Sequence, residues 1–165
     1  MKIIEQEEVR KLLQPKDCIQ LMAEALKGLE SGEYAQPARL ITVMPNTAKF
    51  GFMPAYVGDY FGAKVISAFA PNMGTKYPSH IGYVMLFESA HSTVAGMIEA
   101  GSITEIRTGA VSAAATDLLA RKDSHKLALI GAGAQARSHL AAIREIRDIT
   151  SVTVYDLFPQ AQLRR

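Results

Sequence analysis

A glycine-containing turn between two apolar segments is the part of the sequence whose residue types and spacing point most directly to a ligand. Residues 131–136 read G-A-G-A-Q-A, which fits the G-x-G-x-x-G/A pattern of turns that hold a dinucleotide pyrophosphate. Gly131 allows a tight turn, Gly133 lets the backbone approach the pyrophosphate, and the small Ala136 allows the next helix to pack closely on a sheet. Free N–H groups and the positive end of that helix would bind the phosphates.

The segments around this turn follow one another in the order that a dinucleotide site requires. Residues 127–130 predict a buried strand, a helix continues over 138–147, and residues 152–156 predict a second strand. Asp156 lies 23 residues after Gly133, close to where a carboxylate would reach a ribose 2′-hydroxyl. Its charge would repel a 2′-phosphate, so the pattern favours NAD over NADP. An ordinary strand–helix–strand turn without a ligand is the alternative.

Three cations lie in apolar surroundings. Arg39 and Lys64 fall within β-rich runs, and Arg107 falls in the first turns of a helix rich in small residues. Burying a cation is costly unless an anion meets it, so a bound carboxylate or phosphate would account for all three together. Arg107 also opposes the dipole at a helix N-terminus, which favours an anion nearby. The alternative is that each side chain reaches solvent or pairs with a carboxylate of the protein.

The rest of the chain predicts the elements that position these residues. A helix is predicted over residues 15–32, and an edge strand over residues 2–4. The β-rich runs have short connections that suit antiparallel neighbours, and they cover residues 39–44, 50–53, 62–69, 83–87 and 93–98. A further helix is predicted over 103–121, capped by Ser102 or Thr104. Its side chains are small enough for the helix to lie close to another backbone.

These elements predict an α/β protein of two parts. Residues 1–121 would form an antiparallel α+β domain, and residues 122–165 would form the first βαβ unit of a Rossmann domain. A dinucleotide fold normally has two such halves, and here no third strand follows Asp156. We therefore expect the chain to be a fragment of a longer protein, the alternative being that another chain supplies the missing half. Phe158 to Arg165 would begin the next helix.

Composition excludes several classes of function. The 165 residues carry a net charge of +2 with acids and bases interspersed, which gives no indication of nucleic acid or an anionic membrane as a partner. Cys18 is the only cysteine, so no internal disulfide can form, and no apolar run is long enough for a signal peptide or membrane helix. These features favour a cytoplasmic location. The four histidines lack metal-ligand spacing, so no metal site is predicted.

Several motifs together resemble the ornithine cyclodeaminase/mu-crystallin family. They are G-A-K-V-I at 62–66, Y-P-S-H at 77–80, V-M-L-F-E at 84–88, I-T-E-I-R-T-G-A-V-S-A at 103–113 and L-I-G-A-G-A-Q at 129–135. The resemblance covers nearly the whole chain but only about the N-terminal half of a family member. It implies a homodimer formed through the antiparallel domain, a Rossmann domain for NAD(H) or NADP(H), and an amino-acid or imino-acid substrate.

The resemblance also implies roles for individual residues. Arg39 and Lys64 match positions that hold the substrate, and Arg107 matches one where substrate carboxylate and cofactor meet. The cofactor-binding positions, besides Arg107 and the turn glycines Gly131 and Gly133, are Ser79, Thr108, Ala134, Gln135 and Asp156. The family's acidic proton-transfer residue lies further along the Rossmann domain, so no catalytic residue is assigned within this chain. We expect little or no activity from these 165 residues alone.

Three functions therefore stay open. The first is NAD-dependent conversion of a small amino acid, either ornithine to proline with loss of ammonia, or a dehydrogenase or ketimine reductase reaction. The second is a non-enzymatic binding or dimerisation module of the mu-crystallin type. The third is a plain α+β dimerisation domain with an unused βαβ segment.

Overall fold

The protein, described here from a computed structural model covering residues 1–157, divides into two compact units. The first unit contains Met1–Leu12 and Ala25–Ile103, and the second contains Leu13–Glu24 and the chain from Thr104 onward. The helix predicted over 103–121 therefore groups mainly with the second unit. The predicted boundary between functional domains near residue 121 stays a prediction. The helix expected from Phe158 lies outside the described residues.

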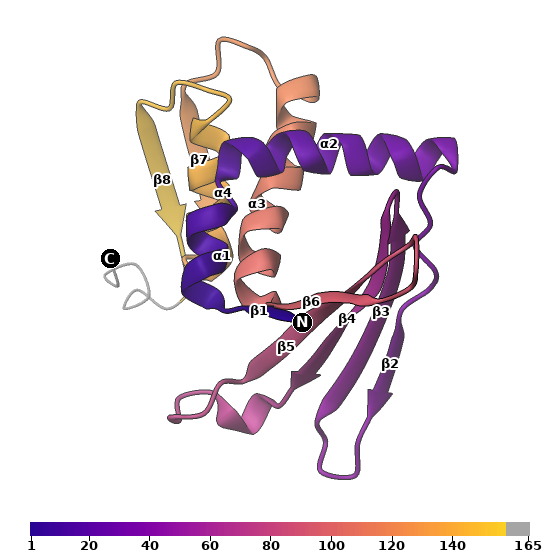
Figure 1. The fold of residues 1–165 in the computed structure, drawn as a ribbon. Helices are drawn as coiled ribbons and strands as arrows, with labels where there is room; N and C mark the ends of the chain where they lie inside the picture. Colours follow the sequence, from indigo (N-terminus) through magenta and orange to yellow (C-terminus); the bar gives the residue numbers. More distant parts are fainter. Residues whose placement is uncertain (158–165) are drawn as a thin grey trace. The chain divides into compact units, whose positions relative to one another are not determined.

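A six-stranded sheet forms the first unit (Figure 1). Its strand order is β1-β6-β5-β4-β3-β2. The parallel pair is β1 with β6, and the other four pairs are antiparallel. The bounds are β1 Lys2–Ile4, β2 Leu40–Val43, β3 Lys49–Val57, β4 Tyr60–Ala68, β5 His80–Glu88 and β6 Val94–Glu99. All six strands predicted for this unit are confirmed, and β3, β4 and β5 each extend to nine residues.

The register divides the sheet into two chemically different faces, because paired residues in antiparallel strands point to the same side. We call one the Lys64 face; its members include Ile41, Gly51, Met53, Ala55, Gly62, Lys64, Ile66, Gly82, Val84, Leu86, Gly96 and Ile98. We call the other the phenylalanine face; its members include Leu40, Phe50, Phe52, Phe61, Val65, Ile81, Tyr83 and Phe87. Glycines therefore gather on the Lys64 face and aromatic rings on the other.

The helix predicted near the N-terminus begins and ends at residues that favour helix ends, and one short helix before it was not predicted. Helix α2 (Pro15–Ser31) begins at the predicted proline and ends before Gly32, whose φ of 78° is the left-handed conformation that terminates helices. Helix α1 (Gln6–Leu12) was not predicted, because its seven residues bury only Val9 and carry no full apolar stripe. It lies against β6. A short 3-10 helix, η1, spans Ala70–Asn72.

The second unit contains the predicted βαβ segment. Its elements are β7 (Lys126–Ile130), α4 (Ala134–Arg144) and β8 (Ser151–Tyr155), and β7 and β8 are parallel neighbours. Ala113 of α3 (Ala100–Leu119) packs with Ala142 and Ile143 of α4 to form a small core. Ile19, Leu127, Ile146 and Ile149 cover that core. Ile130 of β7 is 90% exposed, which is unusual for a parallel strand.

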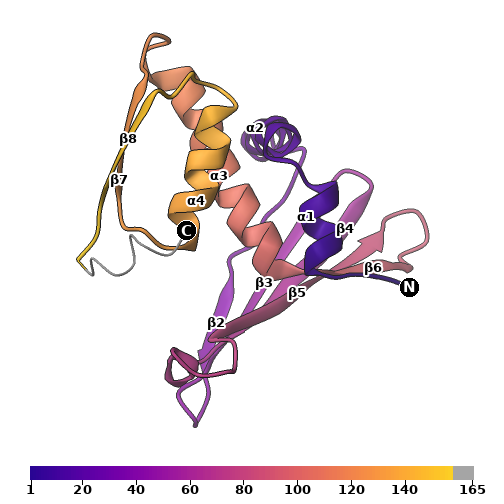
Figure 2. The same cartoon turned by 90° about the vertical axis from the view of Figure 1, so that its left-hand side faces the viewer.

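Helices α3 and α4 lie side by side in both views, as the small-residue surface of α3 predicts (Figures 1 and 2). A Cβ added at Gly109 would stand 2.4 Å from the carbonyl oxygen of Ser138, so only glycine allows this separation of the two backbones. The Ser112 hydroxyl lies 2.9 Å from His139 Nε2, and His139 Nδ1 lies 2.7 Å from the Gln135 carbonyl oxygen. A carbonyl oxygen can only accept, so Nδ1–H donates to it, and the Ser112 hydroxyl lies within hydrogen-bond distance of the other ring nitrogen.

The ends of α3 are stabilised by residues outside the helix. The N-terminal cap is Glu99, whose carboxylate accepts hydrogen bonds from the backbone N–H groups of Gly101 and Ser102. The prediction that Ser102 or Thr104 caps the helix is therefore wrong, because the helix begins earlier, at Ala100. Ser102 is instead buried within the first turn, where its hydroxyl oxygen has no hydrogen-bond partner within residues 1–157.

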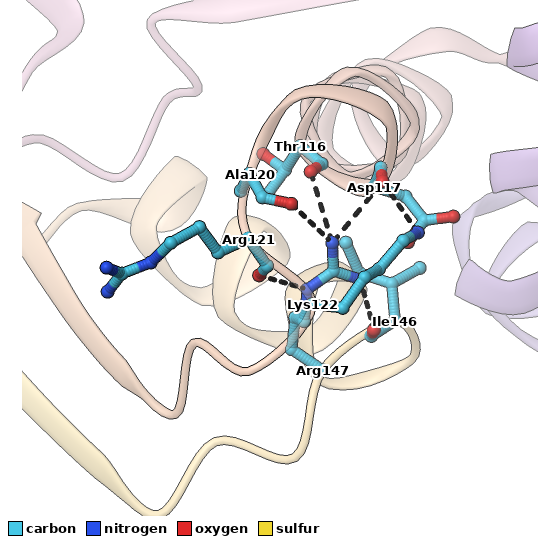
Figure 3. Close-up of polar contacts among 7 residues, drawn as sticks. All are labelled: Thr116, Asp117, Ala120, Arg121, Lys122, Ile146 and Arg147. Carbon is cyan, nitrogen blue, oxygen red and sulfur yellow. Dashed lines mark hydrogen bonds and ion pairs between the residues drawn. The ribbon is translucent and has the colours of Figure 1, made fainter.

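At the other end of α3, the guanidinium of Arg147 lies among the last carbonyl oxygens (Figure 3). It donates to the carbonyls of Thr116, Asp117, Ala120, Arg121 and Ile146. Arg147 Nη1 also lies 2.5 Å from Asp117 Oδ1, which Lys122 Nζ contacts at 2.8 Å. The buried cation thus satisfies both a carboxylate and the orphan carbonyls of a helix C-terminus, where positive charge is favoured.

Within the described residues, no helix is both long enough and apolar enough to cross a membrane.

Candidate functional site

The glycine turn has the geometry that its sequence predicts. Gly131 has a φ of 97°, a conformation that side chains disfavour, and its N–H donates to the Tyr155 carbonyl at 2.7 Å. Gly133 has an ordinary φ of −76°. Gly133 matters for the space beside it rather than for its conformation, because a Cβ built there meets no atom of residues 1–157 within 4 Å. The space that a side chain would fill is therefore left open beside the backbone.

This open turn leads directly into the N-terminus of α4. Gly133 is the N-cap residue, and no side chain of the described part of the chain caps the helix. Ala134 and Gln135 follow in the first turn and are exposed. The first N–H groups of a helix lack intrahelical partners and carry partial positive charge, so this end is suited to an anion such as a pyrophosphate.

Asp156 lies beside the same turn. Its Oδ2 accepts a hydrogen bond from the Ala132 N–H at 2.7 Å. This bond joins the end of β8 to the turn after β7, so the carboxylate lies beside the glycine turn.

Arg107 and Thr108 lie in the second and third turns of α3 and are half-buried. The Thr108 hydroxyl donates to the Thr104 carbonyl at 2.6 Å. Arg107 is close enough to the buried Cys18 to act on it electrostatically: burial raises the pKa of the Cys18 thiol, and the positive charge of Arg107 partly offsets this rise. Because Thr108 precedes Gly109, which contacts Ser138, α3 brings this segment close to the start of α4.

In the first unit, Lys64 lies at the middle of β4, half-buried, between Met53 of β3 and Val84 of β5. Arg39 is exposed and precedes β2, and the register of β2, extended by one residue, places it opposite Met53. Two strand spacings then separate the backbones of Arg39 and Lys64, about 10 Å. Two long cationic side chains on one face at this separation can converge on a single carboxylate.

Ser79 lies elsewhere in the first unit. It precedes β5, and its carbonyl accepts from the Phe69 N–H at 2.8 Å, while its hydroxyl oxygen lies 3.4 Å from His80 Nδ1. Five residues separate Ser79 from Val84, the neighbour of Lys64, which corresponds to roughly 17 Å along an extended strand. The sheet therefore brings Arg39 and Lys64 together but leaves Ser79 at its end.

Sequence reasoning missed two contributions to these sites. Met53 lies in the row between Arg39 and Lys64, and only the strand register reveals this. The hydrogen bonds of His139 to Gln135 and Ser112 were missed because they join residues of two helices. Among the described residues, no group of three or more metal-binding side chains occurs.

The chain matches a known protein family over nearly its full length. The sequence profile of the ornithine cyclodeaminase/mu-crystallin family matches residues 1–164. Ketimine reductase mu-crystallin of Mus musculus is 35% identical over 127 residues, covering 75% of this chain and 40% of its own length.

Two solved structures superpose on nearly the entire chain. Thermococcus litoralis Δ1-pyrroline-2-carboxylate reductase, in complex with NADH and L-proline, has a TM-score of 0.92 at 32% identity, with 99% of this chain and 52% of that one covered. An archaeal alanine dehydrogenase dimer with bound NAD also has a TM-score of 0.92, at 28% identity, with 98% and 50% covered. The chain spans about half the length of the relatives it matches.

Proposed function

The chain belongs to the ornithine cyclodeaminase/mu-crystallin family, and from that premise we propose that it is part of an NAD-dependent oxidoreductase acting on a small amino or imino acid. The observation that carries this proposal is the open bend at Gly133, which leads into an uncapped helix N-terminus with the Asp156 carboxylate beside it. An open backbone, unpaired N–H donors and a carboxylate acceptor suit the pyrophosphate and ribose of a dinucleotide.

Arg39 and Lys64 would hold the substrate carboxylate. Two cations that bind one carboxylate restrict its rotation, so the carbon bearing the nitrogen is presented in one orientation. Arg107 would contribute a third positive charge where carboxylate and cofactor meet. NAD supplies the hydride chemistry when bound, while the protein contributes binding, orientation and proton placement.

The dinucleotide would be held by the backbone of Gly131, Gly133, Ala134 and Gln135, by Asp156, and by the hydroxyls of Ser79 and Thr108. Asp156 supports NAD rather than NADP, because its negative charge would repel a 2′-phosphate. The structures with NADH or NAD in two relatives of the same fold support this choice.

We propose that these 165 residues have little activity by themselves. The family resemblance places the acidic proton-transfer residue at a position that this chain does not contain.

We also propose a homodimer formed through the phenylalanine face. Leu40, Phe50, Phe52 and Ile81 are all exposed there, and contiguous exposed apolar side chains commonly mark a protein interface. A relative of the same fold is described as a dimer.

Titration with NAD, followed by calorimetry, tests the proposed dinucleotide site. We expect saturable binding by the protein in its full natural length, and a loss of about tenfold to a hundredfold in Asp156→Ala, since hydrogen bonds to charged groups are worth about 1.5–3 kcal/mol. Asp148→Ala, at an exposed position of the same unit, is the control. Equal affinity in both variants would contradict the assignment of Asp156.

A binding protein of the mu-crystallin type is the second candidate, because a relative of that name is 35% identical. Amino-acid-dependent change in NADH absorbance separates the two candidates. An enzyme must show this change with at least one substrate, whereas a binding module shows NAD binding alone.

A further inference from the structure

Helices α3 and α4 run in the same direction where they pack together (Figure 2). Gly109 of α3 lies against the backbone of Ser138 in α4. Four residues further along each helix, Ala113 packs with Ala142. The contacts therefore advance together from the N-terminus to the C-terminus of both helices, and the two helices are parallel neighbours.

This parallel packing brings two proposed cofactor-binding segments to the same end of the helix pair. Arg107 and Thr108 immediately precede Gly109, and Gln135 lies three residues before Ser138. At a rise of about 1.5 Å per residue, the backbone of Arg107 lies about 3 Å before the Gly109–Ser138 contact and that of Gln135 about 4.5 Å before it. The two backbones are therefore nearly level, and their separation depends on how the helices are aligned along their axes.

The small residues of this interface fix the distance between the helices more firmly than their alignment. Packed helices resist sliding because side-chain ridges of one fit into grooves of the other. Gly109, Ala113 and Ala142 have at most one methyl group each, so their ridges are shallow. A directional bond across the interface would fix the alignment as well.

The contact between Ser112 and His139 is such a bond. The Ser112 hydroxyl oxygen lies 2.9 Å from His139 Nε2, and both residues are half-buried. On the other side of the ring, Nδ1–H donates to the Gln135 carbonyl oxygen at 2.7 Å. The Ser138 hydroxyl donates to the same carbonyl at 3.1 Å and lies 3.3 Å from Gln135 Oε1. The imidazole ring therefore connects α3 to Gln135 in the first turn of α4.

We propose that Ser112 and His139 are positioning residues for the dinucleotide site, because their contact keeps the first turn of α4 aligned with Arg107 and Thr108. This inference rests on the proposed function. The pair acts through Gln135 and through the alignment of the helices, rather than by touching the cofactor. Without the bond, α4 can shift along α3, and its N–H groups no longer meet the pyrophosphate at the position that α3 requires.

Two substitutions of His139 separate its two hydrogen bonds. In His139→Asn the side-chain amide takes the place of Nδ1, so the bond to Gln135 is kept and the link to Ser112 is lost. In His139→Gln the amide reaches the place of Nε2, so the link to Ser112 is kept. By calorimetry on the protein in its full natural length, we expect His139→Asn to weaken NAD binding by about threefold to tenfold, and His139→Gln to retain most of the wild-type affinity.

Ser112→Ala removes the same link from the other helix. Alanine is a stronger helix former than serine, so we expect this variant to fold. It should weaken NAD binding by the same factor as His139→Asn, and the double variant should weaken it no further, because both substitutions remove one interaction. Ala115→Gly, at an exposed position of α3, is the control for a general loss of stability and should leave NAD affinity unchanged.

The outcomes distinguish this inference from the proposed function. Unchanged NAD affinity in Ser112→Ala and His139→Asn would overturn the inference and leave the proposed function standing. Additive losses in the double variant, equal losses in His139→Asn and His139→Gln, or a similar loss in Ala115→Gly would overturn it as well. Absence of saturable NAD binding by the wild-type protein would instead contradict the proposed function, and the inference with it.

Discussion

Lys64 combines a cationic head with a stem that lies among apolar neighbours on its sheet face. We therefore expect Lys64→Met, which keeps the apolar stem and removes the charge, to lower kcat/KM of the full-length protein by about tenfold to a hundredfold, as expected for one charged hydrogen bond. Lys49→Met is the matched control, because Lys49 lies at the exposed start of β3 on the same face. Equal kinetics in both variants would argue that Lys64 has no contact with substrate.

Glu88 is a charged residue with a structural role, because its carboxylate accepts hydrogen bonds in the β5–β6 turn. Hydrogen bonds from the backbone N–H groups of Thr93 and then His91 hold the pKa of its carboxyl below the ordinary value. A lowered pKa in the folded state means that the ionised form contributes stability above the unfolded-state pKa of about 4.3, and that this stability is lost as the pH falls through the lower folded-state pKa.

Chemical denaturation at pH 6 and pH 3 measures this contribution of Glu88. We expect Glu88→Gln to reduce the loss of stability between the two pH values, since the side-chain amide does not titrate and its single oxygen can accept only part of these hydrogen bonds. Glu33→Gln, at an exposed position, should keep the wild-type pH dependence. The same dependence in both variants would show that Glu88 is not a source of acid sensitivity.

At the scale of elements, the close packing of α3 on α4 depends on Gly109. Alanine normally stabilises a helix by about 1 kcal/mol relative to glycine. At Gly109 we expect the opposite sign, because the added Cβ would meet the Ser138 carbonyl oxygen at 2.4 Å and force the two backbones apart. Gly109→Ala should therefore lower the Tm and weaken NAD binding, since the displaced α4 carries Ala134 and Gln135.

The exposed Ala115, on the same helix, is the matched control for Gly109. At this position the protein with alanine should be more stable than the protein with glycine. Ala115→Gly should therefore lower the Tm and leave NAD affinity unchanged. A stabilised Gly109→Ala variant would contradict the packing seen between α3 and α4.

Arg147 connects the C-terminus of α3 to the segment between α4 and β8 (Figure 3). Removing its buried guanidinium leaves several helix carbonyls without a donor, and each unsatisfied buried group costs about 1–3 kcal/mol. We expect Arg147→Met to lower the free energy of unfolding by about 2 kcal/mol or more, measured by urea denaturation. Arg144→Met, at an exposed position one turn earlier, should change it by less than about 0.5 kcal/mol. Equal losses in the two variants would refute the capping role.

At the scale of the whole molecule, the phenylalanine face predicts self-association. Phe52 is 41% exposed at the centre of its strand, although aromatic side chains normally dominate buried surfaces. We expect Phe52→Glu to convert a dimer to a monomer in light scattering after size exclusion, and Leu12→Glu, on the exposed side of α1, to remain a dimer. Circular dichroism checks that both variants fold. A Phe52→Glu dimer would place the interface elsewhere.

The sequence by itself determined the features that are local along the chain. The βαβ segment is predicted by the apolar run, the two glycines and the small residues at the start of the helix. Each of these features lies within a few consecutive residues. The strands of the first unit follow from β-rich runs between turn residues, and contiguous motifs carry the family resemblance.

Only the tertiary structure decided how distant residues meet. The order of the strands does not fix their register, and a slip of one residue would move every side chain to the other face. The placement of Arg39, Met53 and Lys64 in one row therefore required the paired strands. Arg147 was missed as a helix cap for the same physical reason, because its guanidinium reaches the end of α3 from a distant part of the chain. Glu99 was missed for a local reason, because α3 begins three residues earlier than predicted.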